Sequence, residues 1–298
     1  MGNKNFGNWL LFILLALIWG SSFILMKKSA EHLTGWQIAA IRILSAGLVF
    51  LPFALFHLRS IPVRKLPLVA LSGLLGNFFP AFLFAIAIEK KVNSSLAGIL
   101  NSLTPLFVIV LGALFFRLKV ERRKIAGVLV GLAGLVILSL SRGRVAVNDL
   151  GLTFMILLAT ICYGLNVNLV GIYLKGLDPV KMATVSLLFM TIPAGLIVWN
   201  SELLSMFRYD DEARLSMATA TLLGIAGSAI ATALFYLLIQ KAGPLFASLV
   251  TYAIPVVAIG WGLIAKEEIS LVQVGCLLLI LGGVYIANRK KEPATDSR

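Results

Sequence analysis

The chain has 298 residues, of which 59% are hydrophobic and only 13% are charged, and its mean hydropathy is +0.97. Soluble domains carry about 25% charged residues, so this composition excludes an ordinary soluble globular protein. The charges gather at intervals and leave apolar stretches long enough to cross a hydrocarbon core of roughly 30 Å. We therefore expect an all-α membrane protein that crosses the bilayer many times.

Cutting the chain at its charge clusters predicts ten transmembrane helices. Their approximate ranges are 7–26, 35–56, 66–88, 92–116, 125–140, 150–174, 182–199, 217–240, 243–265 and 270–287. The first range continues with bulky residues and has no small-residue cleavage site, so it predicts an uncleaved span rather than a signal peptide.

The distribution of basic residues predicts the orientation in the membrane. An even number of spans places both termini on one side. Of the 26 Lys and Arg residues, 16 fall on that side, nine fall on the other, and Arg42 lies within a span. The positive-inside rule therefore places both termini in the cytoplasm. We expect the chain to reside in the inner membrane of the cell. This topology accounts for the net charge of +13, and nucleic-acid binding is not expected.

The two halves of the chain repeat one pattern. L-A-G-I-L-N-S-L-T-P (96–105) aligns with F-A-S-L-V-T-Y-A-I-P (246–255), and I-W-G (18–20) lies opposite C-Y-G (162–164). We expect two five-helix repeats, 1–145 and 146–298, the second ending in a short basic cytoplasmic tail. An odd number of spans forces the copies into opposite orientations, and inverted repeats are typical of secondary transporters with a site near the midplane.

The order of the motifs points to a family. A-L-I-W-G-S-S-F (16–23) is followed by A-A-I-R (39–42), a proline in the fourth span and a helix with Gly127 and Gly134, and all recur in weaker form. This pattern resembles the drug/metabolite transporter superfamily, EamA-like branch, over residues 8–288. The resemblance implies a ten-helix carrier of two inverted repeats that moves small metabolites, commonly outward.

Inward-facing polar and aromatic side chains are the candidate substrate-binding residues. A polar group that faces lipid without a partner costs several kcal/mol, so such stripes should turn inward. Aromatic walls with a few amide and hydroxyl groups suit a small organic ligand. The alternative is helix contact through small residues and hydroxyls. Besides Arg42, the candidates are Trp19, Ser22, Asn77, Asn101, Tyr163, Asn166, Tyr236, Thr251 and Tyr252.

Arg42 is the one charge placed well within a span. An intramembrane ionisable residue costs at least about 2.5 kcal/mol at the bilayer centre and indicates a functional site by default. If Arg42 lines a cavity, a substrate carboxylate is its natural counter-charge, which favours amino or organic acids. The alternative is a structural charge near the outer surface with Glu31 as its partner. Its repeat partner is Ser186, so the second half lacks the charge.

Two prolines interrupt apolar spans at equivalent positions. A proline in a helix interior costs about 3 kcal/mol or more, because it removes a backbone hydrogen bond. We predict that Pro105 and Pro255 act as hinges, the alternative being bends that only shape the bundle. The freed carbonyls would be those of Asn101 and Thr251, with side chains such as Ser102 and Thr104, water or substrate as partners.

Glycines in the fifth and tenth spans predict close helix packing. Gly127, Gly131 and Gly134 belong to the first set, and Gly275, Gly282 and Gly283 belong to the second. Such residues let helices approach closely. Packing within a monomer is favoured over a homodimer contact.

The preferred function is a carrier that exports amino-acid-like solutes by alternating access around a midplane cavity, with membrane lipid as its surroundings. Uptake or exchange of nucleosides, cofactors or drugs is one alternative, and a scaffold that transports nothing is another. The sequence shows no paired carboxylates, His/Ser set or metal-ligand cluster, so no enzyme activity, metal or cofactor is expected.

The placement of acidic residues makes a prediction about energy coupling. All 13 acidic residues, as well as His32 and His57, fall in loops or at span ends. A proton-driven antiporter usually needs an intramembrane carboxylate or His. In proteoliposomes with a pH-sensitive dye, we expect solute flux without stoichiometric proton exchange. Proton counterflow that disappears when one of these carboxylates is neutralised would contradict this.

Overall fold

The computed structural model describes residues 2–92, 97, 100–141, 150–264 and 271–288, and in these ranges the regular structure is helical throughout. Six apolar segments are long enough to cross a membrane, namely Phe6–Ser29, Gly35–Leu58, Val63–Glu89, Leu150–Ile172, Pro179–Trp199 and Asp211–Ala242. Thr104–Phe116, Pro244–Val257 and Leu278–Ala287 are shorter apolar helices. The all-helical membrane class is confirmed, whereas the count of ten spans stays a prediction. The expected boundary between the halves, 145/146, lies outside the described residues.

The helices follow the predicted ranges closely. In chain order they are α1 (Gly2–Ser29), α2 (Gly35–Leu58), the 3₁₀ turn η1 (Val63–Lys65), α3 (Leu66–Gly73), the π-helical η2 (Leu74–Phe78), α4 (Phe79–Glu89), α6 (Thr104–Phe116), α7 (Arg122–Ser141), α8 (Leu150–Ile172), α9 (Pro179–Trp199), α10 (Leu203–Tyr209), α11 (Asp211–Gly224), the π-helical η3 (Ile225–Ile230), α12 (Ala231–Ala242), α13 (Pro244–Ser248), α14 (Val250–Ile264) and α15 (Leu271–Asn288). The short α10 is an addition to the predicted elements.

Side-chain caps explain where several helices begin. Thr34 and Gln37 form a reciprocal capping box at the start of α2. Asp178 accepts a hydrogen bond from the first turn of α9, and Asp210 does the same for α11. Because an N-cap oxygen satisfies amides that have no partner in the helix, α9 and α11 begin several residues before the expected Met182 and Met217.

Two spans contain a π-helical turn that the sequence analysis did not predict. η2 joins α3 to α4 in the first half of the chain (residues 2–141), and η3 joins α11 to α12 in the second half (residues 150–288). The two turns lie at matching positions of the halves and centre on G-N (76–77) and G-S (227–228). π turns inside α-helices occur frequently at functional sites.

The expectation that Pro105 sits in a helix interior is wrong. Ser102 and Leu103 form a turn, α6 begins at Thr104, and Pro105 lies in its first turn. The missing N–H of a proline leaves no intrahelical bond unmade there. Pro255 does lie inside its helix, α14, and the ninth predicted span is broken earlier, at Leu249.

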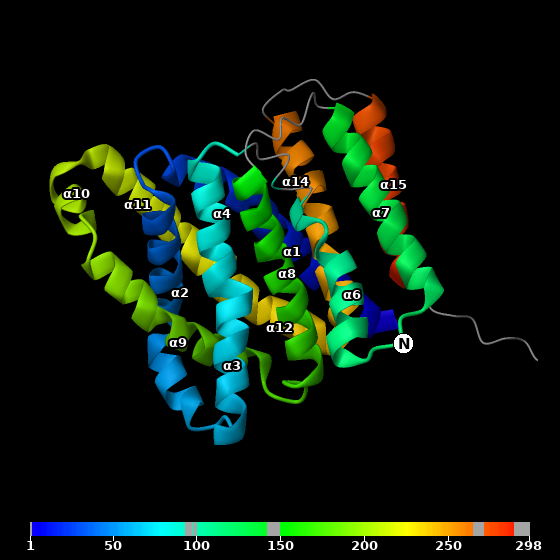
Figure 1. Cartoon of the computed structure of the whole chain (residues 1–298), viewed down its shortest axis with the longest axis horizontal. Helices are drawn as coiled ribbons and strands as arrows, with labels where there is room; N and C mark the ends of the chain where they lie inside the picture. The colour runs from blue at the N-terminus through cyan, green and yellow to red at the C-terminus, as the bar shows by residue number, and fades with distance from the viewer. Residues whose placement is uncertain (1, 93–96, 98–99, 142–149, 265–270, 289–298) are drawn as a thin grey trace, which may run out of the picture.

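The helices pack in reciprocal pairs, shown in the bundle of Figure 1. α1 contacts α11, α12 and α14 of the second half, and α8 in turn contacts α3, α4 and α6 of the first half. α2 packs along α9, and α7 packs along α15 at one end of the bundle. Each of these contacts therefore joins one half of the chain to the other. The contacts of α1 have their counterpart, with the halves exchanged, in the contacts of α8.

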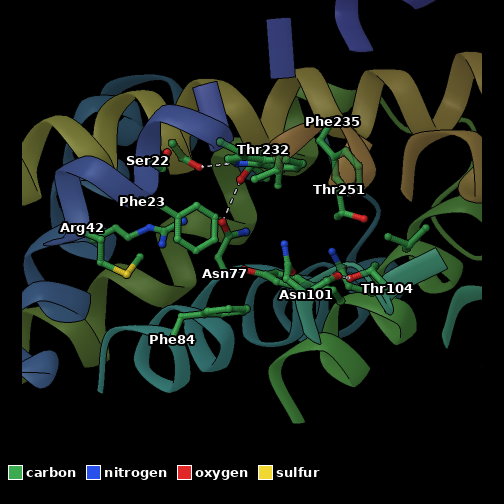
Figure 2. A pocket seen from close by; sticks show the side chains of 18 of the residues that line it. Ser22, Phe23, Arg42, Asn77, Phe84, Asn101, Thr104, Thr232, Phe235 and Thr251 are labelled. Atoms are coloured by element: carbon green, nitrogen blue, oxygen red, sulfur yellow. Dashed lines mark hydrogen bonds between the residues drawn. The ribbon is translucent and has the colours of Figure 1, made fainter. Parts of the chain in front are cut away.

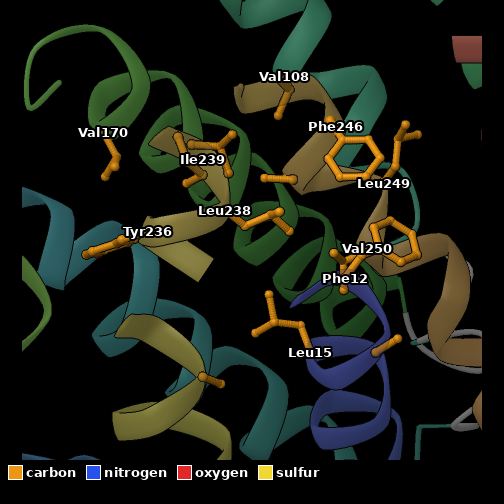
Figure 3. Packing of buried hydrophobic residues seen from close by; sticks show 14 of the residues in the cluster. Phe12, Leu15, Val108, Val170, Tyr236, Leu238, Ile239, Phe246, Leu249 and Val250 are labelled. Atoms are coloured by element: carbon orange, nitrogen blue, oxygen red, sulfur yellow. The ribbon is translucent and has the colours of Figure 1, made fainter. Parts of the chain in front are cut away.

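Two large hydrophobic clusters form most of the core, and a small third one joins Ala46, Leu187 and Ala229. One of the large clusters draws on α1, α6, α8, α12, α13 and α14, and Figure 3 shows Phe12 and Leu15 of α1 facing Phe246, Leu249 and Val250. The other is built mainly from α2, α4, α8, α9 and α11. Both clusters combine residues from the two halves.

Glycines allow α7 to lie directly against α14 and α15. A side-chain carbon on Gly127 would meet the backbone nitrogen of Ala287 at 2.5 Å, and one on Gly131 would overlap the ring of Tyr252. Gly283 faces the backbone of Gly131 in the same way. These contacts match the expected packing within one chain. The expectation is wrong for Gly275 and Gly282, where a side-chain carbon would meet nothing within 4 Å.

Two adjacent glycines of α15 should differ in how strongly substitution by alanine destabilises the protein. A side-chain carbon at Gly283 would overlap the backbone of α7, whereas at Gly282 it would meet nothing within 4 Å. Because backbone atoms cannot move aside as a flexible side chain can, Gly283→Ala should destabilise the protein by about 1–3 kcal/mol. Gly282→Ala serves as the matched control.

The measurement is the melting temperature of each purified variant in detergent. We expect a clear decrease for Gly283→Ala and little change for Gly282→Ala. Equal melting temperatures for the two variants would show that α7 and α15 do not pack as described.

Candidate functional site

A cavity lies between the two large hydrophobic clusters and is lined by both halves of the chain. Met26 and Phe84 of its wall belong to one cluster, and Val167 and Tyr236 belong to the other. The lining comes from α1, α2, η2, α4, α6, α8, η3, α12 and α14, together with Asn101. Its empty space, open mouth included, is about 860 Å³, which is room for a small organic molecule.

Nine of the ten predicted binding residues line this cavity. They are Trp19, Ser22, Arg42, Asn77, Asn101, Tyr163, Asn166, Tyr236 and Thr251. Figure 2 shows Arg42, Asn77, Asn101 and Thr251 around the same space. Their location at one cavity is established by the structure, and their role in binding stays a prediction.

The prediction is wrong for Tyr252, which is not among the residues that line the cavity. Its ring packs against Gly131, and its hydroxyl donates a hydrogen bond to the carbonyl oxygen of Val128 at 2.8 Å. Successive residues of a helix point about 100° apart. Thr251 therefore faces the cavity while Tyr252 faces α7.

Ten lining residues were not among the candidate binding residues: Phe23, Met26, Gly76, Phe84, Thr104, Val167, Gly227, Thr232, Phe235 and Ile254. Phe235 lies three residues after Thr232 and packs edge-on against Trp19, with ring centroids 5.0 Å apart. Helical spacing from Thr232 could have identified it. Phe23 lies four residues after Trp19 in α1, so the same spacing places it on the face of Trp19.

The two glycines bring the halves together at the π turns. A side-chain carbon on Gly76 of η2 would overlap the amide of Asn166 in α8. One on Gly227 of η3 would meet the hydroxyl of Ser22 in α1 at 2.9 Å. Each π turn thus approaches the first helix of the opposite half, and only a glycine leaves room for that approach.

Three side chains of the first half bond to the span that contains η3. Trp19 Nε1 donates to the carbonyl oxygen of Gly227 at 3.0 Å, and Arg42 Nε donates to Ser228 Oγ at 2.7 Å. Thr232 Oγ1 donates to Asn77 Oδ1 at 2.9 Å. These bonds hold η3 and the start of α12 from three different elements of the first half.

Arg42 faces the cavity without an acidic partner. The alternative partner Glu31 is wrong, because Glu31 pairs with Lys28. None of the four ion pairs among the described side chains includes Arg42, and the described lining holds no carboxylate. The wall of the cavity therefore carries one uncompensated positive charge.

Three asparagines of the lining each carry a polar atom without a hydrogen-bond partner. These atoms are Asn77 Nδ2, Asn101 Oδ1 and Asn166 Oδ1. Each of the three residues is at most 7% exposed. An unsatisfied buried donor or acceptor costs about 1–3 kcal/mol, so a ligand that bonds to these atoms would recover that free energy.

The two backbone carbonyls that precede Pro105 and Pro255 by four residues accept hydrogen bonds from side chains, as expected. Thr104 Oγ1 donates to the Asn101 carbonyl at 2.6 Å, and Ser102 Oγ donates to the Thr251 carbonyl at 3.5 Å. The first bond is local to one break in the helices. The second joins the broken fourth span of the first half to α14 of the second.

Comparisons with known proteins agree with this arrangement. The sequence model of the EamA-like transporter family matches residues 7–140 and again residues 151–289. "Uncharacterized inner membrane transporter YedA" of Escherichia coli (strain K12) is 28% identical over 93% of this chain and 89% of its own length. The "Probable amino-acid metabolite efflux pump" of Salmonella typhimurium is 30% identical over 47% of this chain and 46% of its own. A solved structure, "Crystal structure of protein", shares the fold with a TM-score of 0.68 at 20% identity, over 94% of this chain and 96% of that one.

Removing the Thr104 hydroxyl should lower the stability of the protein, because it leaves a carbonyl at the helix break without a hydrogen bond. Pro105 has no N–H to offer the Asn101 carbonyl, so Thr104→Val should destabilise the protein by about 1–3 kcal/mol. Thr191→Val is the matched control, because the Thr191 hydroxyl bonds to the Leu187 carbonyl four residues back within a regular helix. Thermal unfolding in detergent measures both. Equal losses would mean that the Thr104 bond has no special role at the break.

Proposed function

The chain belongs to the EamA-like transporter family, and on that premise we propose that this membrane transporter exports small amino-acid-like organic solutes. The observation that carries the proposal is the cavity between the halves, whose wall combines aromatic residues, amides and the charge of Arg42. Such a wall suits a small solute with polar groups at fixed positions.

We propose that ten helices form two inverted five-helix repeats, 1–145 and 146–298. The double match to the family model supports the duplication. The matched π turns and the reciprocal packing of α1 and α8 support an exchange of the halves by a two-fold rotation. With five spans in each repeat, this rotation would invert the second copy in the membrane.

In this arrangement, transport proceeds by alternating access as the halves rock around the cavity. The bonds from Trp19, Arg42 and Asn77 to the η3 span cross between the halves, so they would rearrange in each cycle. The hinge proposed for Pro255 stays within α14. In the fourth span, the hinge moves from Pro105 itself to the turn at Ser102 and Leu103.

Several observations support the substrate class and the setting. Arg42 has no acidic partner in the described part of the chain, which favours a solute with a carboxylate. The half-length similarity to the Salmonella protein, named as an efflux pump for amino-acid metabolites, supports both the class and the direction. We further propose an inner-membrane monomer with both termini in the cytoplasm and no catalytic activity. The basic-residue count, the Escherichia coli relative and the glycine packing within the chain support this setting.

A flux screen tests the function. The protein in proteoliposomes should move at least one amino acid faster than protein-free vesicles, in a panel that also holds nucleosides, vitamins and cationic drugs. Asn101→Ala should lower that flux about tenfold, which corresponds to the loss of one buried hydrogen bond to substrate. Asn168→Ala is the control, because Asn168 is buried away from the cavity and bonds to the carbonyls of Val108 and Gly164.

The outcomes separate the functions. Movement of nucleosides, vitamins or drugs in place of amino acids would favour the other carrier classes. If no compound crosses faster than in protein-free vesicles, the carrier function is wrong and the scaffold becomes the better explanation.

A further inference from the structure

The polar groups of the cavity divide into donors at one end and acceptors at the other. Arg42 and the unpartnered Nδ2 of Asn77 can only donate hydrogen bonds. The unpartnered Oδ1 atoms of Asn101 and Asn166 can only accept them; both oxygens are enclosed in the wall, so a half-turn of each amide is needed to present them to the space. Figure 2 shows Arg42 and Asn101 on opposite sides of the space, with Asn77 between them.

The donor end is built to receive an anion. Ser228 accepts from Arg42 Nε, which fixes the plane of the guanidinium. No described residue accepts a hydrogen bond from its two terminal nitrogens, so that edge is available for the two oxygens of a carboxylate. Thr232 holds the Oδ1 of Asn77, which leaves its Nδ2 as a second donor.

The acceptor end is built to receive an N–H donor without a charge of its own. Asn101 precedes α6 and Asn166 lies in α8, so two elements from different halves supply the two oxygens. Both side chains are more than nine-tenths buried. Amide oxygens can solvate an ammonium group but do not neutralise it, so a cation here would still feel the repulsion of Arg42 unless it carried its own anion.

The remaining wall between the ends is apolar. Trp19 and Phe235 pack edge to face, and Phe84 stacks with Tyr163 at a centroid distance of 6.2 Å. Such surfaces accept an aliphatic or aromatic side chain.

We propose that the cavity selects dipolar solutes, with an anionic group on Arg42 and Asn77 and an ammonium group on Asn101 and Asn166. The proposal rests on the carrier function above and sharpens it, because it predicts a ranking. A zwitterion satisfies both ends, an acid without its amine satisfies one, and an amine without its acid meets the uncompensated charge of Arg42. Lipophilic cations are therefore the poorest ligands.

Matched solutes test this ranking. Phenylalanine, 3-phenylpropanoate and phenethylamine share one side chain, and leucine, 4-methylpentanoate and 3-methylbutylamine share another. Each compound competes with the flux of a labelled solute that the proteoliposomes transport. The zwitterion of at least one set should compete at least about tenfold better than its acid and its amine.

Two substitutions should change different selectivity ratios. Arg42→Met should reduce the preference for the zwitterion over the amine by about tenfold or more, with a smaller effect on its preference over the acid. Asn101→Leu should do the reverse. A residue with only a structural role would weaken all three compounds alike. Arg42→Lys should restore part of the first preference, and it replaces Arg42→Met if that variant does not fold. Asn168→Leu should change neither ratio, because that buried asparagine lies outside the cavity lining.

The results distinguish the two proposals. If solutes cross but amines or acids compete as well as the zwitterions in both sets, dipolar selection is wrong and the carrier function stands. If Arg42→Met and Asn101→Leu shift both ratios equally, the assignment of the two ends is wrong. If nothing crosses, the carrier function itself fails.

Discussion

Within a hydrocarbon layer, every backbone N–H and C=O needs a partner inside the protein, because no water is present to replace one. The chain departs from regular α-helix at η2, at Ser102–Leu103, at η3 and at Leu249. Side chains serve carbonyls beside three of these departures: Thr104 bonds to Asn101, Ser102 to Thr251, and Trp19 to Gly227. Irregular backbone at membrane depth is tolerated where it is buried in protein or lines a cavity. The interrupted helices and the cavity are thus one feature. The bonds that Ser102 and Trp19 make to the opposite half satisfy interrupted backbone and also enclose the space between the halves.

The wall of the cavity departs from the rule that buried polar groups are paired. Away from the cavity, polar side chains such as Gln240 and Tyr252 bond to the carbonyls of Leu177 and Val128, and Asn168 Oδ1 is the one further buried atom without a partner in the described part of the chain. At the cavity, Arg42 has no acidic partner among the described side chains, and three asparagines each keep one atom unpaired. A protein made only for stability would replace such groups, since apolar residues of the same shape can be neutral or stabilising there. Their concentration around one space is the physical reason to regard it as a ligand site.

Helical spacing and charge predicted the spans and nine residues of the cavity, because a polar stripe on an apolar helix must turn away from lipid. The same argument could not place Tyr252. Periodicity shows which face of a helix turns away from lipid, but it does not show whether a residue on that face meets another helix or the cavity. Tyr252 and Thr251 both face inward, one toward α7 and one toward the cavity. The π turns escaped prediction because both spans are apolar on nearly every face, so the shift of about 100° that one extra residue introduces leaves no visible mark in the sequence. Pro105 was misplaced for a related reason: the turn at Ser102 and Leu103 lies in a continuous apolar run, and it is stabilised by the local bond from Thr104 to Asn101 together with the tertiary bond from Ser102 to Thr251.

The two halves share a backbone pattern but differ in the chemistry that they present to the cavity. Trp19 corresponds to Tyr163, Ser22 to Asn166 and Arg42 to Ser186. Ser186 is fully buried in α9 and bonds to the Ala183 carbonyl, so it supplies no counterpart to the charge. In the proposed alternating access, similar backbones would allow one half to take the place of the other, whereas identical side chains would offer a ligand the same groups at both ends. A solute with two unlike ends needs an unlike wall. Side chains that differ between the halves, on backbones that pack alike, would therefore suit both the proposed motion and a ligand held in one orientation.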